Sequence, residues 1–376
     1  MVLRRAPTLP GFCPRAKRYG NPVAIATLST DSTPASSHDQ SCNRILSGIQ
    51  PTGIPHLGNY CGAISHWAKF QKENKNGLKR SDLMFTIVDL HAITVPYDPK
   101  NMQSRVRDTL ATLLAVGLDP LKCTMFKQSD ILLHADLSWR LGCITPLKWL
   151  QRMTQYKCKT EQQQKDADFG LLAYPILMAA DILLYRATLV PVGDDQQQHL
   201  ELARMIATAF NHRFKCSLFD PPMPHLSEHE MCRIMSLRDA SKKMSKSDPS
   251  AWARINLNDS EKMIQKKISK AQSDGISGIT FNKLERPAIS NLLSILSAVT
   301  ESTIPSLVSQ YENYQTSAFK KVVADAVISK ISPIRRRIRE YQKDSGYLDT
   351  VLENGASKAS IIAAETMDRV RKVMCV

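Results

Sequence analysis

The sequence has no uninterrupted apolar run of eighteen residues, and this absence argues against a membrane-spanning helix. Its nine cysteines form no C-x-x-C pair and no paired Cys/His spacing, so neither a zinc site nor a secreted disulfide framework is indicated, and a reducing compartment is favoured. No internal repeat and no long heptad seam is present, which argues against solenoid and coiled-coil architectures. With 376 residues the chain can bury a sizeable core and is expected to divide into two domains.

The N-terminal thirty residues contain no acidic residue, and the first one in the chain is Asp31. The preceding stretch is rich in Ser, Thr, Ala and Pro and carries five basic residues: Arg4, Arg5, Arg15, Lys17 and Arg18. This composition is typical of an organelle transit peptide, which we expect at residues 1–42, with a disordered cytosolic tail as the alternative. Without residues 1–42, which hold five basic and two acidic residues, 45 basic and 33 acidic residues remain, a net charge of +12. This excess favours a polyanionic partner.

Short apolar segments alternate with helical patterns in the first half of the chain. Strands are expected at 44–49, 84–88, 124–126 and 189–192, and helices at 60–67, 100–116, 171–185 and from 193 to about 210. A proline-marked loop is expected at 221–224, and beyond residue 258 only helices, at 260–271, 289–299, 306–311, 318–331, 333–341 and 348–374. The sequence therefore predicts an α/β fold, in which a Rossmann-like parallel sheet is followed by a helical C-terminal domain. In such sheets ligands bind beyond the carboxyl ends of the strands.

The first expected strand leads into a glycine-containing turn, Gln50-Pro51-Thr52-Gly53, and then into a helix. This order presents exposed backbone N–H groups and the positive end of a helix, where an anion can bind. Glycines at positions 58 and 62 would let a ligand and a neighbouring backbone approach closely. An ordinary strand-to-helix turn without a ligand is the alternative.

Asp181 is the only charged residue in the strongly apolar segment 171–185, so we expect it to be buried and to need a hydrogen-bond donor. Pro175 suits the first turn of this helix. Tyr174, Met178 and Asp181 are spaced to share one helix face. Such a face can hold a flat ring that carries one N–H or O–H group. Alternatively, Asp181 pairs with a structural Arg or Lys.

Residues 240–249 (ASKKMSKSDP) place lysines three apart among small hydroxyl residues, with one Met as an anchor. Ammonium groups, hydroxyls and backbone N–H groups in this order can surround a polyphosphate. A solvated basic loop is the alternative for any lysine-rich segment. A second basic cluster, at residues 335–339, gives one C-terminal helix a strongly basic face. A merely solvated surface is the alternative.

Residues 243–247 match the KMSKS signature of class I aminoacyl-tRNA synthetases, and residues 56–59 (HLGN) resemble their HIGH signature. The second and fourth positions of the latter, Leu57 and Asn59, depart from the common pattern in a way that occurs within one branch of the class. That branch is the bacterial-type tryptophanyl-tRNA synthetases, which the chain resembles from about residue 44 to its C-terminus. The segments that carry the resemblance are 47–53 (SGIQPTG), 88–94 (VDLHAIT), 152–155 (RMTQ), 174–185 and 190–196 (VPVGDDQ).

The resemblance implies a role for particular residues. Asp181 would accept the indole N–H of tryptophan. The other residues implied to bind tryptophan are Leu46, Gly48, His91, Tyr174, Met178, Val190, Val192 and Gln196. Those implied to hold ATP are Gln50, His56, Gly58, Asn59, Lys159, Gly193, Asp195, Ile234, Lys243, Met244 and Lys246. Catalysis would depend on Lys243, Lys246, Gln50, His56 and Asn59, with Mg²⁺ on the ATP phosphates and no metal held by side chains.

The resemblance also implies domains and partners. A catalytic domain at 43–235 and a signature loop at 236–258 would precede an anticodon-binding helical domain at 259–376, which could pack back on the catalytic domain. The expected partners are L-tryptophan, tRNA(Trp) and a second copy of the chain, without membrane or DNA. With its N-terminal extension, the chain looks like a mitochondrial form acting in the matrix.

Three other interpretations stay open at the level of sequence. Tyrosyl enzymes share the fold and place an Asp on the corresponding helix, so physical reasoning alone does not separate tyrosine from tryptophan. An inactive RNA-binding protein derived from a synthetase would show the same basic helical domain. A nucleotidyl transferase of the same superfamily, acting on another small acid, is the third alternative.

Overall fold

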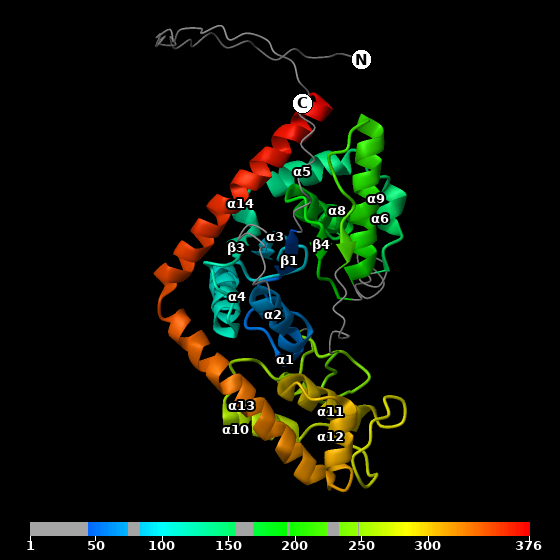
Figure 1. Ribbon diagram of the computed structural model, residues 1–376, viewed down its shortest axis with the longest axis vertical. Coiled ribbons are helices and arrows are strands. Elements are labelled where there is room, and N and C mark those ends of the chain that lie inside the picture. The colour runs from blue at the N-terminus through cyan, green and yellow to red at the C-terminus, as the bar shows by residue number, and fades with distance from the viewer. Residues whose placement is uncertain (1–43, 74–82, 155–167, 194–195, 225–232, 247) are drawn as a thin grey trace, which may run out of the picture. The chain divides into compact units, whose positions relative to one another are not determined.

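The computed structural model describes residues 44–73, 83–154, 168–193, 196–224, 233–246 and 248–376. They include a parallel sheet of five strands in the order β3-β2-β1-β4-β5 (Figure 1). The strands are β1 (Ile45–Ile49), β2 (Leu83–Ile87), β3 (Thr124–Lys127), β4 (Leu189–Val190) and β5 (Met223–Pro224). The strand order changes direction between β1 and β4, and ligands of such sheets bind at this point beyond the carboxyl ends. The predicted fold class is therefore confirmed.

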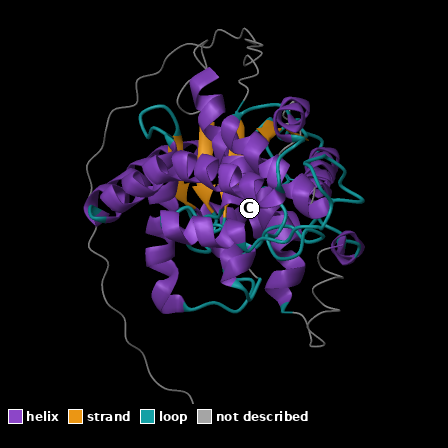
Figure 2. Cartoon of the chain, turned by 90° about the horizontal axis from the view of Figure 1, so that it is seen from below, coloured by secondary structure: helices purple, strands orange, loops and turns teal. Residues whose placement is uncertain are grey.

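Helices cover both faces of the sheet (Figure 2). One face packs its apolar residues, including Leu46, Met84 and Phe126, against α5 (Leu133–Gly142), α8 (Phe169–Leu184) and α9 (Gln197–Phe214). Because side chains alternate along a strand, their neighbours Ile45, Phe85 and Met125 point to the other face. There they meet η1 (Tyr60–Ile64), α2 (Ser65–Glu73) and α4 (Met102–Val116).

A separate apolar cluster joins the helical region to both signature segments. It contains residues of α10 (Glu261–Ser269), α11 (Pro287–Thr300), α12 (Ile304–Tyr311) and α13 (Thr316–Gln342). The same cluster includes Leu57 of the first signature, Tyr60 directly after it and Met244 of the second. The helical region and the two signatures are therefore held by one shared core.

The C-terminal helix α14 (Ser345–Met374) packs back on the sheet and runs along β3 (Figure 1). At Gly355 a Cβ atom would lie 1.7 Å from the Met125 carbonyl oxygen, so only glycine allows this contact between helix and strand. The helix thereby covers an edge strand whose backbone could otherwise pair with another chain. The predicted packing of the C-terminal helices onto the sheet domain is observed for α14, whereas the proposed domain boundaries stay a prediction.

Several expected boundaries were wrong. Pro333 does not separate two helices but lies inside α13, since Ile331, Ile334 and Ile338 are all buried on one side of the continuous helix. Pro175 lies inside α8, which starts at Phe169 rather than at residue 171. The expected loop at 221–224 contributes β5. In each case tertiary packing outweighs the local preference of proline.

The remaining short elements are α1 (Leu57–Asn59), α3 (Asp89–Ala92), η3 (Pro99–Asn101), η4 (Gln128–Asp130), α6 (Leu147–Gln151) and η6 (Ala251–Ala253). Within the described ranges, no single helix is both long and apolar enough to cross a membrane, although α11 and α12 taken together as a bent pair meet that test.

Candidate active site

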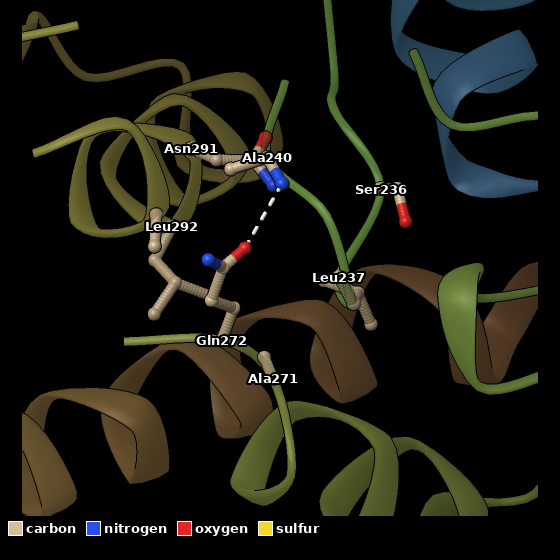
Figure 3. Close-up of a pocket in the computed structure, with 8 residues that line it drawn as sticks. Ser236, Leu237, Ala240, Ala271, Gln272, Asn291 and Leu292 are labelled. Atoms are coloured by element: carbon tan, nitrogen blue, oxygen red, sulfur yellow. Dashed lines mark hydrogen bonds between the residues drawn. The ribbon is translucent and has the colours of Figure 1, made fainter. Parts of the chain in front are cut away.

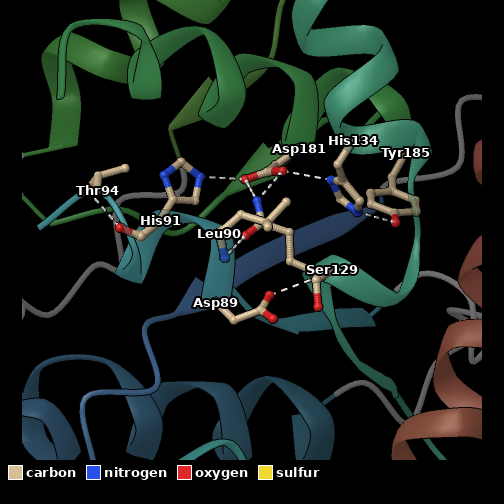
Figure 4. A network of polar contacts seen from close by, with 9 residues as sticks. Asp89, Leu90, His91, Thr94, Ser129, His134, Asp181 and Tyr185 are labelled. Atoms are coloured by element: carbon tan, nitrogen blue, oxygen red, sulfur yellow. Dashed lines mark hydrogen bonds and ion pairs between the residues drawn. The ribbon is translucent and has the colours of Figure 1, made fainter. Parts of the chain in front are cut away.

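Asp181 lies on α8 at the centre of a buried hydrogen-bond network (Figure 4). Its carboxylate accepts from Gln128 Nε2 at 2.8 and 2.9 Å, from His91 Nε2 at 2.8 Å and from His134 Nδ1 at 2.7 Å. His91 lies on α3 after β2, Gln128 follows β3, and His134 lies on α5. Among the residues that the structure describes, the donors are these three side chains and not the Arg or Lys that the sequence left as an alternative. Three elements converge on one carboxylate instead.

The network keeps Asp181 ionised. Burial would raise the pKa of this carboxyl, but the hydrogen bonds from His134 and His91 outweigh burial and lower the pKa to about 2. An ionised carboxylate only accepts hydrogen bonds, so each of the two histidines must present an N–H to it. The site therefore holds a negative charge that is fully desolvated and oriented.

Backbone contacts fix the donors in turn. Gln128 Oε1 accepts the Leu90 N–H at 3.1 Å, which leaves its amide nitrogen facing Asp181. Asp89 Oδ1 accepts the Ser129 N–H at 3.0 Å. These two bonds hold α3 against the residues after β3 at the carboxyl end of the sheet (Figure 4). His91 of α3 is therefore fixed in position toward α8.

Tyr174 extends the network on the same face of α8. Its ring meets His91 edge-on, with centroids 6.2 Å apart, and its hydroxyl lies 2.7 Å from Nε2 of His199 on α9. Other predicted ring-binding residues lie in the surrounding apolar cluster: Leu46, Met178, Val190 and Val192. Gly48, near the end of β1, is exposed. The structure thus brings the residues implied to bind the amino acid to one region.

The second signature pairs with a segment that precedes it in the chain. The Met244 N–H bonds the Ile234 carbonyl at 3.1 Å, and Lys243 pairs with Met235 in an antiparallel bridge. The Met244 side chain is buried, and its Cβ would lie 3.5 Å from a Cβ placed on Gly58. The methionine therefore anchors the lysine segment against the first signature, as its position in the motif predicted.

His56 and Asn59 form the N-terminal cap of α1, the short helix within the first signature. His56 Nδ1 accepts the Asn59 N–H at 3.2 Å, and the Asn59 side-chain oxygen accepts the His56 N–H at 3.1 Å. Burial, together with Lys246, Arg254 and Lys243, lowers the pKa of His56 to about 3. The imidazole is therefore neutral near pH 7 and, because Nδ1 accepts, its proton resides on Nε2.

Lys246 joins the second signature to the turn after β1. Its ammonium donates to the Thr52 hydroxyl at 3.0 Å and to the Gly53 carbonyl at 2.6 Å, both in the turn after β1. Burial, with added repulsion from Arg254 and Arg105, lowers the pKa of Lys246 to about 8. Lys243 is exposed at the surface. The turn that was predicted to bind an anion is therefore the place where the lysine segment lies.

The helical region holds the base of the lysine segment (Figure 3). Asn291 on α11 accepts the Met235 N–H at 2.8 Å and donates to the Met235 carbonyl at 3.0 Å. Gln272 accepts the Ala240 N–H at 3.1 Å and donates its own N–H to the Leu237 carbonyl at 2.7 Å. These amides position the segment relative to α11 without touching its lysines.

The remaining predicted residues divide into two groups. Lys159, Asp195 and Ser247 lie outside the described residues, so the ATP-binding roles implied for Lys159 and Asp195 stay predictions. Gln50 is exposed directly after β1, while Gly193 and Gln196 are half-buried after β4 and at the start of α9. The residues following β1, β2 and β3 all lie at the carboxyl edge of the sheet, where the strand pattern predicted ligands.

Sequence reasoning named His91 as a substrate-binding residue but missed the other residues that support Asp181. Gln128 follows the expected strand 124–126, but nothing connected it with α8. His134 lies on α5, where no helix was expected, and His199 lies in an expected helix without a motif. Tyr185 ends the segment 174–185, but nothing gave it a role. The one available signal was the demand of a buried carboxylate for donors. That demand predicts that partners exist without identifying them.

Comparison with known proteins agrees with this geometry. The family model described as "tRNA synthetases class I (W and Y)" matches residues 38–331. The tryptophan–tRNA ligase of Rickettsia felis is 46% identical over 328 residues, covering 87% of this chain and 97% of the relative. That of Thermosynechococcus vestitus is 45% identical over 331 residues, covering 87% and 98%.

Solved structures give the same result. Tryptophanyl-tRNA synthetase from Mycoplasma pneumoniae has a TM-score of 0.76 at 33% identity, covering 89% of this chain and 98% of that one. The Campylobacter jejuni enzyme complexed with ADP and tryptophan has a TM-score of 0.74 at 30% identity, covering 89% and 100%. A tyrosyl-tRNA synthetase from Aeropyrum pernix, at 18% identity and a TM-score of 0.59, shares the fold. The chain therefore belongs to the class I tryptophan and tyrosine tRNA synthetases and, within them, to the bacterial-type tryptophan–tRNA ligases.

Proposed function

We propose that Asp181 recognises the indole N–H of L-tryptophan at the carboxyl edge of the sheet, and that the two signatures hold ATP beside it. The observation that carries this proposal is the convergence of His91, Gln128 and His134 on one ionised carboxylate within an apolar cluster. The related Campylobacter jejuni enzyme was crystallised with ADP and tryptophan, which supports the same pair of ligands here.

The indole N–H needs a lone pair on Asp181. A carboxylate offers about four acceptor positions. Here one nitrogen of Gln128 spans both oxygens, at 2.8 and 2.9 Å, in addition to the bond from each histidine. If Gln128 moves onto one oxygen, a position opens for the substrate. A phenylalanine ring brings no N–H, so Asp181 would be left desolvated and unpaired at that position.

The chemistry begins with attack of the tryptophan carboxylate on the α-phosphorus of ATP. A carboxyl oxygen–phosphorus bond forms, the bond to the bridging oxygen of the β-phosphate breaks, and pyrophosphate leaves. The nucleophile is already ionised near neutral pH, so catalysis rests on positioning and on charge stabilisation of the leaving group. In class I enzymes, the 2′-OH of the terminal ribose of tRNA then attacks the acyl carbon. An ester bond forms, the bond from the acyl carbon to the phosphate oxygen breaks, AMP leaves, and the hydroxyl proton is released.

The phosphate-binding residues suit this step. Lys246 and Lys243 supply ammonium groups next to the turn after β1. His56, neutral with its proton on Nε2, can donate one hydrogen bond to a phosphate oxygen without adding charge. Mg²⁺ would be held by the phosphates of ATP, where it would neutralise charge on the departing pyrophosphate.

Exchange of labelled pyrophosphate into ATP tests this proposal, with tryptophan and tyrosine compared in parallel. We expect exchange to depend on tryptophan and to be far weaker with tyrosine. Tyrosine-dependent exchange that exceeded the tryptophan-dependent rate would overturn the proposed recognition. Charging of mitochondrial tRNA by residues 43–376 tests the second step.

We further propose that the enzyme serves mitochondrial translation. The support is the composition of residues 1–42, which is basic, hydroxyl-rich and nearly free of acids. A fluorescent fusion of these residues is expected to enter mitochondria, and its retention in the cytosol would contradict the proposal.

A homodimer is proposed as the working form. α5 and the residue before it, α6 and the start of α8 expose large apolar side chains: Leu132, Trp139, Leu147 and Phe169. Large exposed apolar patches mark interaction sites. Sedimentation velocity is expected to give a dimer that a charged replacement of Trp139 weakens. A monomer at micromolar concentration would refute the dimer.

A further inference from the structure

Behind Asp181 lies a second layer of the network that the proposed mechanism does not use. His134 on α5 and Tyr185, the residue after α8, are both fully buried, at 0% exposure. His134 Nδ1 bonds Asp181 at 2.7 Å, and His134 Nε2 lies 2.8 Å from the Tyr185 hydroxyl (Figure 4). Neither side chain reaches solvent, so any influence on substrate must pass through Asp181.

The protons of this chain can be assigned from its partners. Because Asp181 only accepts, His134 Nδ1 must carry a proton. A neutral imidazole then has a lone pair on Nε2, to which the Tyr185 hydroxyl can donate. A charged imidazolium would offer Tyr185 a second N–H and leave the buried phenolic proton without this acceptor. The tautomer with its proton on Nδ1 is therefore the one that satisfies all three groups.

Packing holds the two rings in place. Phe126 of β3 lies against both, with ring centroids 6.2 Å from His134 and 5.4 Å from Tyr185. The backbone of Tyr185 is held by the Arg44 guanidinium, which donates to its carbonyl. Burial, with the nearby Asp181 charge, raises the pKa of Tyr185 well above its ordinary value, so the hydroxyl remains a donor. Tyr185 therefore donates to His134, and His134 donates to Asp181.

We infer that His134 and Tyr185 are positioning residues that fix the orientation of the Asp181 carboxylate and thereby set the preference for a ring that bears an N–H. This inference rests on the proposed role of Asp181 in binding the indole. A carboxylate that can rotate forms hydrogen bonds with other donors instead. A ring without an N–H then loses little binding free energy compared with tryptophan. A carboxylate held by a rigid donor leaves its acceptor position unpaired when the N–H is missing.

The experiment compares tryptophan with 3-(3-benzothienyl)alanine, in which sulfur replaces the indole N–H. The readout is the ratio of kcat/KM for the two amino acids in pyrophosphate exchange. Tyr185→Phe removes one hydroxyl without opening a cavity, and Tyr347→Phe, on the exposed start of α14, is the matched control. We expect Tyr185→Phe to lower the preference for tryptophan by about tenfold, chiefly through the KM for tryptophan, since one buried hydrogen bond is lost.

Two replacements of His134 test the same link. His134→Asn keeps an N–H near the Nδ1 position, whereas His134→Leu removes it. We expect the leucine variant to lose most of the preference and the asparagine variant to retain more of it. A structural role alone would impair both amino acids equally in every variant. Equal losses for the two amino acids, or an unchanged ratio in Tyr185→Phe, would overturn the inference.

Asp181→Leu, which has no acceptor, separates this inference from the proposal beneath it. If Asp181→Leu leaves the ratio unchanged, Asp181 is not the N–H acceptor, and both fail. If Asp181→Leu abolishes the preference while the Tyr185 and His134 variants keep it, the inference alone fails. Thermal unfolding of each variant identifies any that do not fold, and the conservative Tyr185→Phe provides the decisive comparison in that case.

Discussion

The two ends of the active site are built in opposite ways. Around Asp181 the functional groups are buried, with exposures of 4% for Asp181, 6% for His91 and 0% for Gln128 and His134. Around the second signature, Lys243 is exposed and Lys246 is half-buried, and both add positive charge to the same loop. One end is buried and hydrogen-bonded internally, whereas the other carries lysine side chains at or near the surface.

This difference follows the task of each end. Discrimination between similar rings requires a rigid acceptor, since the penalty for a missing N–H depends on the acceptor having no other partner. Stabilisation of a leaving pyrophosphate requires positive charge that is accessible to ATP and poorly compensated in its absence. At Lys246, burial with repulsion from Arg254 and Arg105 lowers the pKa to about 8. The two ends are therefore expected to respond differently to substitution.

The largest expected effect is that of Lys246→Ala. The variant should lower adenylate formation by about 100-fold while ATP binds nearly as well, because the ammonium acts mainly on the charge that develops in the transition state. Single-turnover kinetics measures this rate. The preference for tryptophan over benzothienylalanine should not change. Near-normal single-turnover rates, or an altered preference, would show that the two ends are not separate.

A smaller effect is expected from pH. Burial, Arg254 and Arg105 lower the pKa of Lys246 to about 8, so its ammonium is lost as the pH rises through that value in the ATP-free enzyme. The kcat/KM for ATP should therefore fall about tenfold between pH 7 and pH 9, whereas kcat should hold to higher pH because bound phosphates favour the charged form. Lys246→Arg keeps its charge and is the control. A decline of equal size in that variant would assign the titration to another group.

The smallest effect is expected at the base of the lysine segment. Asn291→Ala removes both hydrogen bonds to the Met235 backbone, and Asn313→Ala, on an exposed turn after α12, is the matched control. The KM for ATP should rise about threefold, because the segment loses part of its support but keeps the Met244 anchor. The KM for tryptophan should stay constant. A shift in the tryptophan KM instead would indicate that α11 acts on the other end of the site.

Much of this site could be predicted from residue order. The spacing of the lysines, the glycine turn after the first strand and the lone carboxylate of residues 171–185 all indicated ligand-binding positions, and the structure places them at the carboxyl edge of a parallel sheet. The helical prediction failed where proline was taken as a boundary, because buried isoleucines on either side of Pro333 keep α13 continuous. Local preference is weak compared with burial of a whole helix face.

The sequence alone determined the class of fold, the two signatures and the kind of group that Asp181 must meet. These properties depend on periodicity, turn chemistry and the energetic demand of a buried charge, all of which act within short stretches. Only the tertiary structure decided which donors reach Asp181 and which turn accepts the hydrogen bonds of Lys246. It also decided that residue 355 must be glycine, because any side chain there would collide with Met125. Those contacts join residues far apart in the chain, and their geometry exists only once the helices have packed on the sheet.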